Sequence, residues 1–230
     1  KWNVSDDIRI KAAAGMYSQN LISTSNERDV VNLFSGFLSG PEEQFNNLEG
    51  QPVDSKLQKS RHVVLGVEKD LGPGLRVNVE GYLKDFNQLV VVNRNKTLSS
   101  QSDYSTEEGE AYGVDFSLKY DKAKWYFWVS YSLGFVNRFD GEQEYPTIFD
   151  RRHNTNFLAS YNFGANNDWL VSLRWNYGSG FPFTQTQGFF TDISFLDGIN
   201  TDYQTSNPDN IGIIYSEDRN GGRLPSYHRL

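Results

Sequence analysis

Residues Leu75–Lys84 read Leu-Arg-Val-Asn-Val-Glu-Gly-Tyr-Leu-Lys, a strict alternation of apolar or small side chains with polar ones. Successive side chains of a β-strand point to opposite faces, whereas a helix would scatter Arg76, Glu80 and Lys84 around its circumference. The stretch therefore predicts a strand with one apolar face and one polar face.

The same alternation marks further strands along the chain. They are predicted at Asp7–Tyr17, Ser60–Lys69, Ala111–Tyr120, Trp125–Val136, Thr155–Phe163 and Trp169–Tyr177. We expect every second side chain from Ile8 to Tyr177 to touch hydrocarbon, and the side chains between them to face an enclosed interior.

Short turns separate three pairs of these strands, at Asp70–Gly74, Asp121–Lys124 and Gly164–Asp168. Residues that lie opposite each other in an antiparallel pair share a face, so the apolar rows restrict the possible registers. The predicted pairs are Val67–Val77, with Glu68 opposite Arg76; Tyr120–Trp125, around the loop Lys122-Ala123; and Phe163–Trp169, with Asn167 in the left-handed conformation.

Long polar connections join the strands at their other ends. They are predicted at Ser18–Lys56, Arg94–Glu108, Asn137–His153 and Ser179–Leu224. Outer-membrane barrels have short periplasmic turns and longer extracellular loops, and their strands alternate between lipid-facing and lumen-facing residues. The sequence therefore predicts an all-β fold: an antiparallel transmembrane β-barrel segment with short periplasmic turns and long extracellular loops.

The composition fits this fold class and excludes others. The chain has 230 residues, of which 37% are hydrophobic and 15% aromatic. Its mean hydropathy is −0.60. It has no apolar run near the ~20 residues that a transmembrane helix needs, so a helix that crosses a membrane is excluded. A net charge of −7 without a basic stripe argues against a nucleic-acid partner. The lack of cysteine excludes disulfides and thiol catalysis.

Two of the long loops are acidic. Their carboxylates belong to Glu27, Asp29, Glu42, Glu43, Glu49 and Asp54 in the first loop, and to Asp192, Asp197, Asp202, Asp209, Glu217 and Asp218 in the last. Such runs are most often solvated loop surface, and a site for an ion or a cationic ligand is the alternative.

Catalysis and metal binding find little support in the sequence. His62, His153 and His228 are all expected near the extracellular rim, where histidines more often serve as hydrogen-bonding partners than as ligands. No nucleophile motif accompanies them, and Gly178–Gly180 reads as a bend between a strand and a loop. We therefore expect no enzyme activity, no cofactor and no metal site.

Candidate contact residues lie on the polar face and at the rim. The candidates for contact with a substrate or a plug are Tyr17, Arg76, Glu80, Tyr82, Lys84, Asp115, Lys119, Trp128, Arg174 and Asn176. The candidates at the extracellular rim are Asp150, Arg151, Arg152 and His153, of which the first three are expected to form a salt-bridge cluster.

Several segments together resemble a known family. They are Val79–Phe86, Gly109–Asp115, Tyr145–Asn154, Trp175–Phe183 and Arg223–Leu230. In order and spacing they resemble the C-terminal barrel portion of TonB-dependent outer-membrane transporters, in particular the Bacteroidetes type, whose plug follows a carboxypeptidase-regulatory-like domain.

The resemblance implies a barrel of about 22 strands around a plug, of which this chain supplies about seven to eight. Plug domain, signal peptide and closing C-terminal strands are not recognisable in residues 1–230. Because open sheet edges are not tolerated in lipid, we expect the chain to be a portion of a larger protein. The implied partners are outer-membrane lipid, the protein's own plug, the TonB–ExbB–ExbD motor acting through the missing N-terminal part, and a surface lipoprotein lid.

The leading hypothesis is active import of a scarce nutrient (an oligosaccharide, a peptide or an iron chelate) across the outer membrane of a Gram-negative bacterium. A passive or structural and adhesive outer-membrane barrel is one alternative. A soluble β-sandwich that binds carbohydrate through its aromatic side chains is another.

Overall fold

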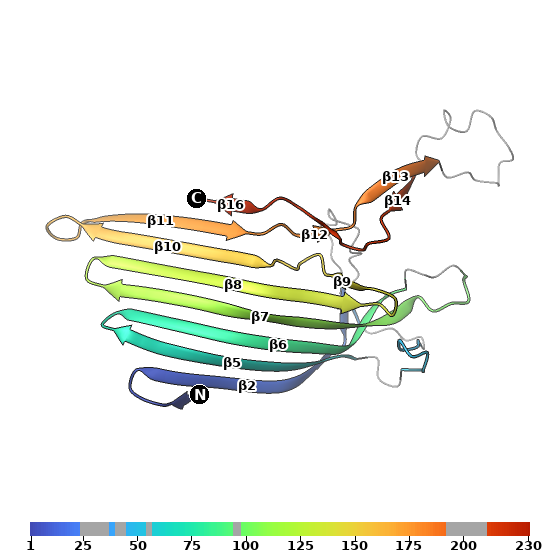
Figure 1. Cartoon of the computed structure of the whole chain (residues 1–230), viewed down its shortest axis with the longest axis horizontal. Helices are drawn as coiled ribbons and strands as arrows, with labels where there is room; N and C mark the ends of the chain where they lie inside the picture. The colour runs from blue at the N-terminus through green and yellow to red at the C-terminus, as the bar shows by residue number, and fades with distance from the viewer. Residues whose placement is uncertain (24–36, 40–44, 54–56, 94–97, 192–210) are drawn as a thin grey trace.

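The computed structural model describes residues 1–23, 37–39, 45–53, 57–93, 98–191 and 211–230. They fold into strands, turns and loops, and none of them lies in a helix that could cross a membrane. The principal element is a single antiparallel sheet of ten strands, in the order β1-β2-β5-β6-β7-β8-β10-β11-β16, with β9 paired to β8 (Figure 1).

The strands of this sheet follow the chain order. Their bounds are β1 (Trp2–Asn3), β2 (Ile8–Gln19), β5 (Gln58–Gly72), β6 (Leu75–Val92), β7 (Tyr104–Lys122), β8 (Trp125–Phe139), β9 (Glu144–Pro146), β10 (His153–Phe163), β11 (Trp169–Gly178) and β16 (Tyr227–Arg229). The predicted strands are therefore all present, and the short strand β16 pairs with β11.

Several strands run further than predicted. The strand predicted at Leu75–Lys84 continues to Val92 as β6, and the connection predicted at Arg94–Glu108 is shorter because β7 begins at Tyr104. The extension follows a register shift between Phe86 and Leu89, after which the β-branched residues Val90–Val92 resume pairing with β7. The prediction failed here because a bulge interrupts the alternation on which it depended.

Two of the three predicted hairpin registers are wrong. Phe163 pairs with Trp169 as predicted, and Asn167 is left-handed at φ 60°. Val67, however, pairs with Val79, and Tyr120 pairs with Phe127. Each register thus differs from the prediction by two residues, which keeps every side chain on its predicted face.

The tighter turns explain these two shifts. Ala123 is left-handed at φ 56°, so that Lys122 pairs directly with Trp125 around Ala123-Lys124 instead of Lys122-Ala123. Gly74, at φ 82°, lets the preceding hairpin close around Pro73-Gly74. As a result Arg76 lies opposite Asp70 and not opposite Glu68.

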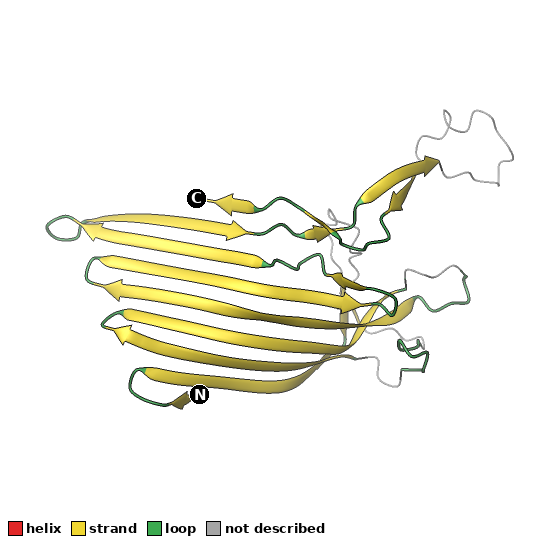
Figure 2. Ribbon diagram, viewed as in Figure 1, coloured by secondary structure: helices red, strands yellow, loops and turns green. Residues whose placement is uncertain are grey.

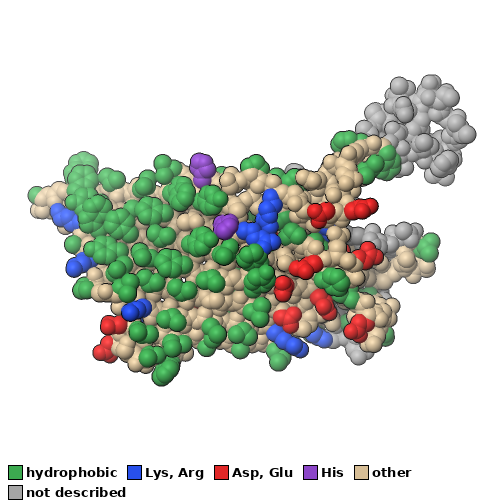
Figure 3. Space-filling model, in the orientation of Figure 1, with side chains coloured by type: hydrophobic (Ala, Val, Ile, Leu, Met, Phe, Trp, Pro, Cys, Tyr) green, Lys and Arg blue, Asp and Glu red, His purple; other side chains and the backbone are tan. Residues whose placement is uncertain are grey.

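The apolar face of the sheet is uncovered. Its rows run straight across the strands, as in the series Val67, Val79, Phe116 and Tyr131. Leu65 is 61% exposed and Leu173 46% exposed, and Figure 3 shows apolar side chains spread over the strands. Within the described residues no second sheet covers this face, as it would in a β-sandwich. The sandwich alternative is therefore wrong.

Aromatic side chains border the apolar face near the short turns. The Trp125 and Tyr161 ring centroids are 4.2 Å apart, and those of Phe163 and Trp169 are 6.3 Å apart. Amphipathic rings at this level are typical of the interfacial girdles of membrane barrels.

The opposite end of the sheet carries the long connections, some of which contain short strands (Figure 2). The additional pairs are β3 (Leu21–Ser23) with β4 (Phe37–Ser39), β12 (Pro182–Phe183) with β15 (Gly222–Arg223), and β13 (Thr186–Thr191) with β14 (Ile211–Tyr215). Most of the acidic loop residues lie outside the described residues: Glu27, Asp29, Glu42, Glu43, Asp54, Asp192, Asp197, Asp202 and Asp209.

Candidate functional site

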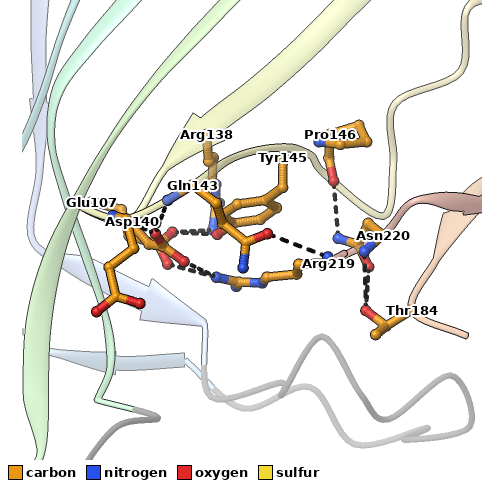
Figure 4. Close-up of polar contacts among 10 residues, drawn as sticks. Glu107, Arg138, Asp140, Gln143, Tyr145, Pro146, Thr184, Arg219 and Asn220 are labelled. Carbon is orange, nitrogen blue, oxygen red and sulfur yellow. Dashed lines mark hydrogen bonds and ion pairs between the residues drawn. The ribbon is translucent and has the colours of Figure 1, made fainter. Parts of the chain in front are cut away.

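The end of the sheet with the long connections holds a polar cluster, the mouth network, shown in Figure 4. Its members are Glu107 of β7, Arg138 of β8, Asp140 and Gln143 of the β8–β9 turn, Tyr145 of β9, Thr184 after β12, and Arg219 and Asn220 before β15. The network therefore joins strands of the main sheet to the last long connection.

Glu107 lies at the centre of the mouth network and is only 4% exposed. Its Oε2 accepts hydrogen bonds from the Tyr145 hydroxyl at 2.7 Å and from Arg138 Nη1 at 3.4 Å. Its Oε1 accepts one from Arg219 Nη1 at 3.2 Å. A buried carboxylate needs such partners to offset the loss of water, and Glu107 has three.

Arg219 links the last long connection to the main sheet. Its guanidinium carbon lies 3.6 Å from the centroid of the Tyr145 ring, and Nη1 also bonds Asp140 Oδ2 at 3.3 Å. Stacking on an aromatic face and ion pairing are compatible in one guanidinium because the ring contacts its flat surface and the carboxylates contact its edge. Arg219 thus fixes the last connection to the sheet.

Asn220 forms the turn between Arg219 and β15. It is left-handed at φ 56° and 3% exposed. Its Nδ2 donates to the Pro146 carbonyl at 2.9 Å, and its Oδ1 accepts from the Thr184 hydroxyl at 3.1 Å. Asparagine tolerates the left-handed region better than other side chains, which suits it to this turn.

A pocket of about 200 Å³ opens beside the mouth network, the mouth pocket. Its lining is mainly polar and includes Ser105, Glu107, Asp140, Glu142, Glu217 and Arg219. The carboxylates of Glu107 and Asp140 are already paired with Arg219, whereas Glu142 is exposed at the pocket. The pocket can accept a polar group that donates hydrogen bonds.

Asp150, Arg152 and Arg223 form a second cluster, the rim cluster. Asp150 is fully buried; its Oδ1 accepts from the Val136 amide at 2.9 Å, and its Oδ2 pairs with Arg152 Nε at 2.8 Å and with Arg223 Nη2. The expected pair of Asp150 with Arg152 is present. The expected participation of Arg151 is wrong, because its guanidinium lies 4.4 Å from the Phe181 ring centroid.

The histidines lie apart from one another. The His62 and Tyr17 rings are tilted against each other with centroids 4.4 Å apart, whereas His153 Nδ1 lies 2.8 Å from the Tyr131 hydroxyl. His228 is paired with Tyr177 in the sheet. In the part of the chain that the structure describes, no three histidine or acidic side chains come close enough to hold a metal ion.

On the polar face, near the short turns, six charged side chains form a charge ladder: Arg9, Lys11, Glu68, Asp70, Arg76 and Glu80. Arg9 bonds Glu68 at 2.6 Å and Asp70 at 2.9 Å, and Arg76 bonds Asp70 at 2.7 Å. Lys11 bridges Glu68 at 2.9 Å and Glu80 at 3.2 Å. Two of the polar-face candidates, Arg76 and Glu80, therefore already have partners within the wall.

The remaining polar-face candidates spread along the sheet and do not converge on one point. Lys119 Nζ lies 3.6 Å from Asp121 Oδ2. Trp128 Nε1 donates to Ser117 Oγ at 3.2 Å, and Asn176 Nδ2 donates to Asn156 Oδ1. In the ladder pairing, Asp115 lies opposite Glu80 and Ser132, and Arg174 lies opposite Leu158.

Tyr82 and Tyr17 both lie over glycines. A Cβ atom at Gly113 would be 2.7 Å from the Tyr82 hydroxyl, and one at Gly134 would be 2.8 Å from it. Lys84 Nζ lies 5.5 Å from the Tyr82 ring centroid. A Cβ atom at Gly15 would likewise be 2.9 Å from the Tyr17 hydroxyl, so glycine makes room for an aromatic ring in both places.

Tyr17 also lines a second pocket, of about 360 Å³, together with His62 and Phe86. The His62 and Phe86 rings meet edge to face at 6.0 Å. This pocket lies at the same end of β2, β5 and β6 as the long connections, and Gln19, Gln58 and Lys59 add polar groups to it.

Sequence reasoning missed most of the mouth network. Glu107 was assigned to a loop, although it lies in β7, and nothing local in the sequence links it to Arg219, which is 112 residues away. Arg223 of the rim cluster was missed for the same reason, because it is 73 residues from Asp150. The usable signals are Tyr145 and Arg223, which lie in the resembling segments Tyr145–Asn154 and Arg223–Leu230.

Comparisons with known proteins agree with the fold. No family model matches the chain. No curated protein matches it either. Among solved structures, P. aeruginosa FpvA bound to heterologous pyoverdines is similar with a TM-score of 0.55 and 9% identity over 80% of this chain and 22% of that one. The complex of FpvAI with pyocin S2 is similar with a TM-score of 0.55 and 8% identity over 99% of this chain and 24% of that one.

The chain thus spans less than a quarter of the length of the solved structures that it matches. At such low identity the likeness concerns the fold alone. The chain shares the all-β fold of the part of the FpvA structures that it matches.

Proposed function

We propose that this chain forms part of the wall and of the extracellular mouth of a TonB-dependent transporter that imports a scarce nutrient across the outer membrane of a Gram-negative bacterium. The role is transport and not catalysis. The partners it requires are outer-membrane lipid, a plug inside the barrel and the TonB–ExbB–ExbD motor. The resembling segments favour the Bacteroidetes type, in which a surface lipoprotein lid is a further candidate partner.

The observation that carries the proposal is the exposure of the apolar face. Trp169, Val171 and Leu65 are 66%, 60% and 61% exposed, in a sheet one layer thick. Soluble proteins rarely leave a contiguous apolar surface of this extent uncovered, because its contact with water is unfavourable. Hydrocarbon on that face removes the cost, and the aromatic border near the short turns lies where lipid headgroups begin.

We place the first contact with the nutrient at the mouth pocket. Its exposed carboxylate Glu142, together with Glu217, favours a ligand that carries hydroxyl or amino donors. An oligosaccharide or a peptide satisfies this condition, whereas an anionic iron chelate would be repelled by the same carboxylates. Among the open substrate classes, the pocket therefore favours the first two.

The two-faced wall can be tested with single cysteines, because the chain has none of its own. We would attach a nitroxide spin label to Val129→Cys on the apolar face or to Ser130→Cys on the polar face of the full-length protein in lipid vesicles. The label at 129 should collide mainly with oxygen, which partitions into lipid, and the label at 130 mainly with a water-soluble nickel chelate. Equal access of the nickel chelate to both labels would contradict the proposal.

Active import is tested separately in cells. Uptake of oligosaccharides and peptides should stop when tonB is deleted or when an uncoupler collapses the proton gradient, while the amount of protein in the outer membrane stays constant. Uptake that survives both treatments would indicate a passive barrel.

A further inference from the structure

The apolar face contains a groove where one of its rows lacks a side chain. Gly81 pairs with Leu65 on one side and with Val114 on the other, and its missing side chain leaves a depression between them. The resulting outer groove has a volume of about 400 Å³ and an almost wholly apolar lining. The lining includes Val63, Leu65, Leu83, Tyr112, Val114 and Phe135.

A cationic group lies at one end of the outer groove. The Phe135 ring, which stacks on Tyr112 at 5.0 Å, is covered by the Arg152 guanidinium at 4.2 Å from its centroid. Leu133, another lining residue, pairs with His153. The groove therefore ends at a guanidinium and an imidazole on the same face of the sheet.

The charge at this point is not fully compensated. Asp150 is the one carboxylate of the rim cluster, and both Arg152 and Arg223 pair with it. One carboxylate against two guanidinium groups leaves one positive charge. Arg152 and Arg223 side chains are 26% and 34% exposed, so an anion can reach them.

The neighbouring row restricts where that anion can lie. Asp85 and Glu110 face each other across β6 and β7, one row beyond Leu83 and Tyr112, and Arg61 of β5 lies opposite Asp85. Two carboxylates against one guanidinium give this row a net negative charge that repels an anion, whereas Arg152 attracts it. An anionic group above the groove is thus directed towards β8 and β10.

We propose that the outer groove and Arg152 bind one phosphorylated lipid of the outer leaflet, with an acyl chain in the groove and a phosphate on the guanidinium. The inference rests on the proposed function, because it requires the apolar face to lie in a membrane. An arginine presents paired N–H donors that match a phosphate, and the groove supplies the apolar contact that a free phosphate would lack.

The groove is tested with Gly81→Leu. A Cβ atom at Gly81 would meet only the Gly113 carbonyl oxygen, at 3.9 Å, so the new side chain fills the groove without displacing the sheet. We would add bisphosphorylated lipid A to the full-length protein in detergent and count bound lipid by native mass spectrometry. Gly81→Leu should weaken binding about tenfold, as expected for the loss of contact with about two methylene groups.

The matched control is Ala12→Leu, which introduces the same leucine side chain in the same row outside the groove, since Ala12 pairs with Leu65. It should leave lipid binding unchanged. Gly81→Leu binding as much lipid A as the unaltered protein would overturn the proposal.

The phosphate contact is tested with Arg152→Gln and lipid A from which the phosphates have been removed. The unaltered protein should bind the phosphorylated form about tenfold more tightly, and Arg152→Gln should bind both forms alike. Arg152→Lys, which keeps the charge and a donor to Asp150, should recover part of the preference and shows whether a loss reflects misfolding. Equal binding of the two lipids by the unaltered protein would also overturn the proposal.

Failure of this inference differs from failure of the proposed function. If only the lipid site is absent, the spin label at residue 129 still reports lipid contact. If the wall does not lie in a membrane, that label reports water.

Discussion

Arg219 connects segments that are far apart in the sequence, because one guanidinium contacts the Tyr145 ring, Glu107 and Asp140 together. Each contact alone would contribute little if it were exposed to water. Here the Arg219 side chain is 13% exposed and that of Glu107 is 5% exposed, so loss of one partner leaves the other charge poorly solvated. The stability of the mouth network therefore depends more on Arg219 as a whole than on any single hydrogen bond that Arg219 makes.

Arg219→Ala should destabilise the protein by about 2–4 kcal/mol, because it leaves the Glu107 carboxylate buried with weaker compensation. Arg219→Lys should lose less stability, because it keeps the positive charge beside Glu107. It should still lose some, because lysine lacks the flat surface that stacks on the Tyr145 ring. The free energy of unfolding of the full-length protein in lipid vesicles measures both. Lys124→Ala is the control, because Lys124 is exposed in the β7–β8 turn outside the mouth network and should change the value by less than about 0.5 kcal/mol.

The glycines beneath Tyr82 differ in what an added methyl group would meet. At Gly113 the nearest atom is the Leu133 backbone carbonyl oxygen, 2.4 Å away, whereas at Gly134 it is the end of the Tyr82 side chain, 2.8 Å away. Gly113→Ala should therefore cost about 1–3 kcal/mol and Gly134→Ala clearly less, because a side chain can move and the strand backbone cannot. Equal losses in urea-induced unfolding would contradict this reading.

At the scale of elements, alternation predicted the strands well and their registers less well. A period of two forbids a slip by one residue but permits a slip by two, which is the error found for Val67 and for Tyr120. The hairpin at Phe163 was predicted correctly because its loop contains Gly164 and Asn167. Glycine and asparagine are the residue types that favour positive φ, and both have positive φ in the structure. Ala123 gives no such signal.

Ala123→Gly should stabilise the β7–β8 hairpin by about 0.5–1 kcal/mol, because Ala123 is held at φ 56° and glycine adopts this conformation without a Cβ clash. Ala13→Gly, in the middle of β2, should destabilise by a similar amount, since there glycine only gains freedom in the unfolded chain. Thermal unfolding of both variants in the same detergent distinguishes the two signs. A loss of stability for Ala123→Gly would show that the turn is not strained.

For the whole molecule, the decisive property is that one sheet carries an apolar face and a polar face. The apolar face is unbroken by charge over most of its rows, while the polar face contains the charge ladder and the aromatic pocket at Tyr17. The separation into an apolar and a polar face was predictable, because apolar and polar residues alternate along the sequence of each strand. The mouth network was not, because its contacts depend on how distant connections fold back over the sheet.

Neighbouring residues of β11 test this division. Leu173→Arg places a charge on the apolar face and should cost about 2–4 kcal/mol in lipid vesicles, as expected for a charged residue facing hydrocarbon. Ser172→Arg places the same side chain on the polar face, where Ser172 contacts Ser160 at 2.9 Å, and should cost less than half as much. Folding yield into vesicles at increasing urea reads out both. Similar costs at the two positions would mean that lipid does not touch Leu173.

The charge ladder has a consequence for selectivity. Its three cations, Arg9, Lys11 and Arg76, are matched by three anions, Glu68, Asp70 and Glu80, within hydrogen-bonding distance or nearly so. Opposite charges in a pair cancel much of each other's field at distances larger than their separation, so this stretch of the sheet presents little net charge. If the chain lines a transport path as proposed, this stretch would not separate solutes by the sign of their charge, and such selection would have to take place nearer the mouth pocket.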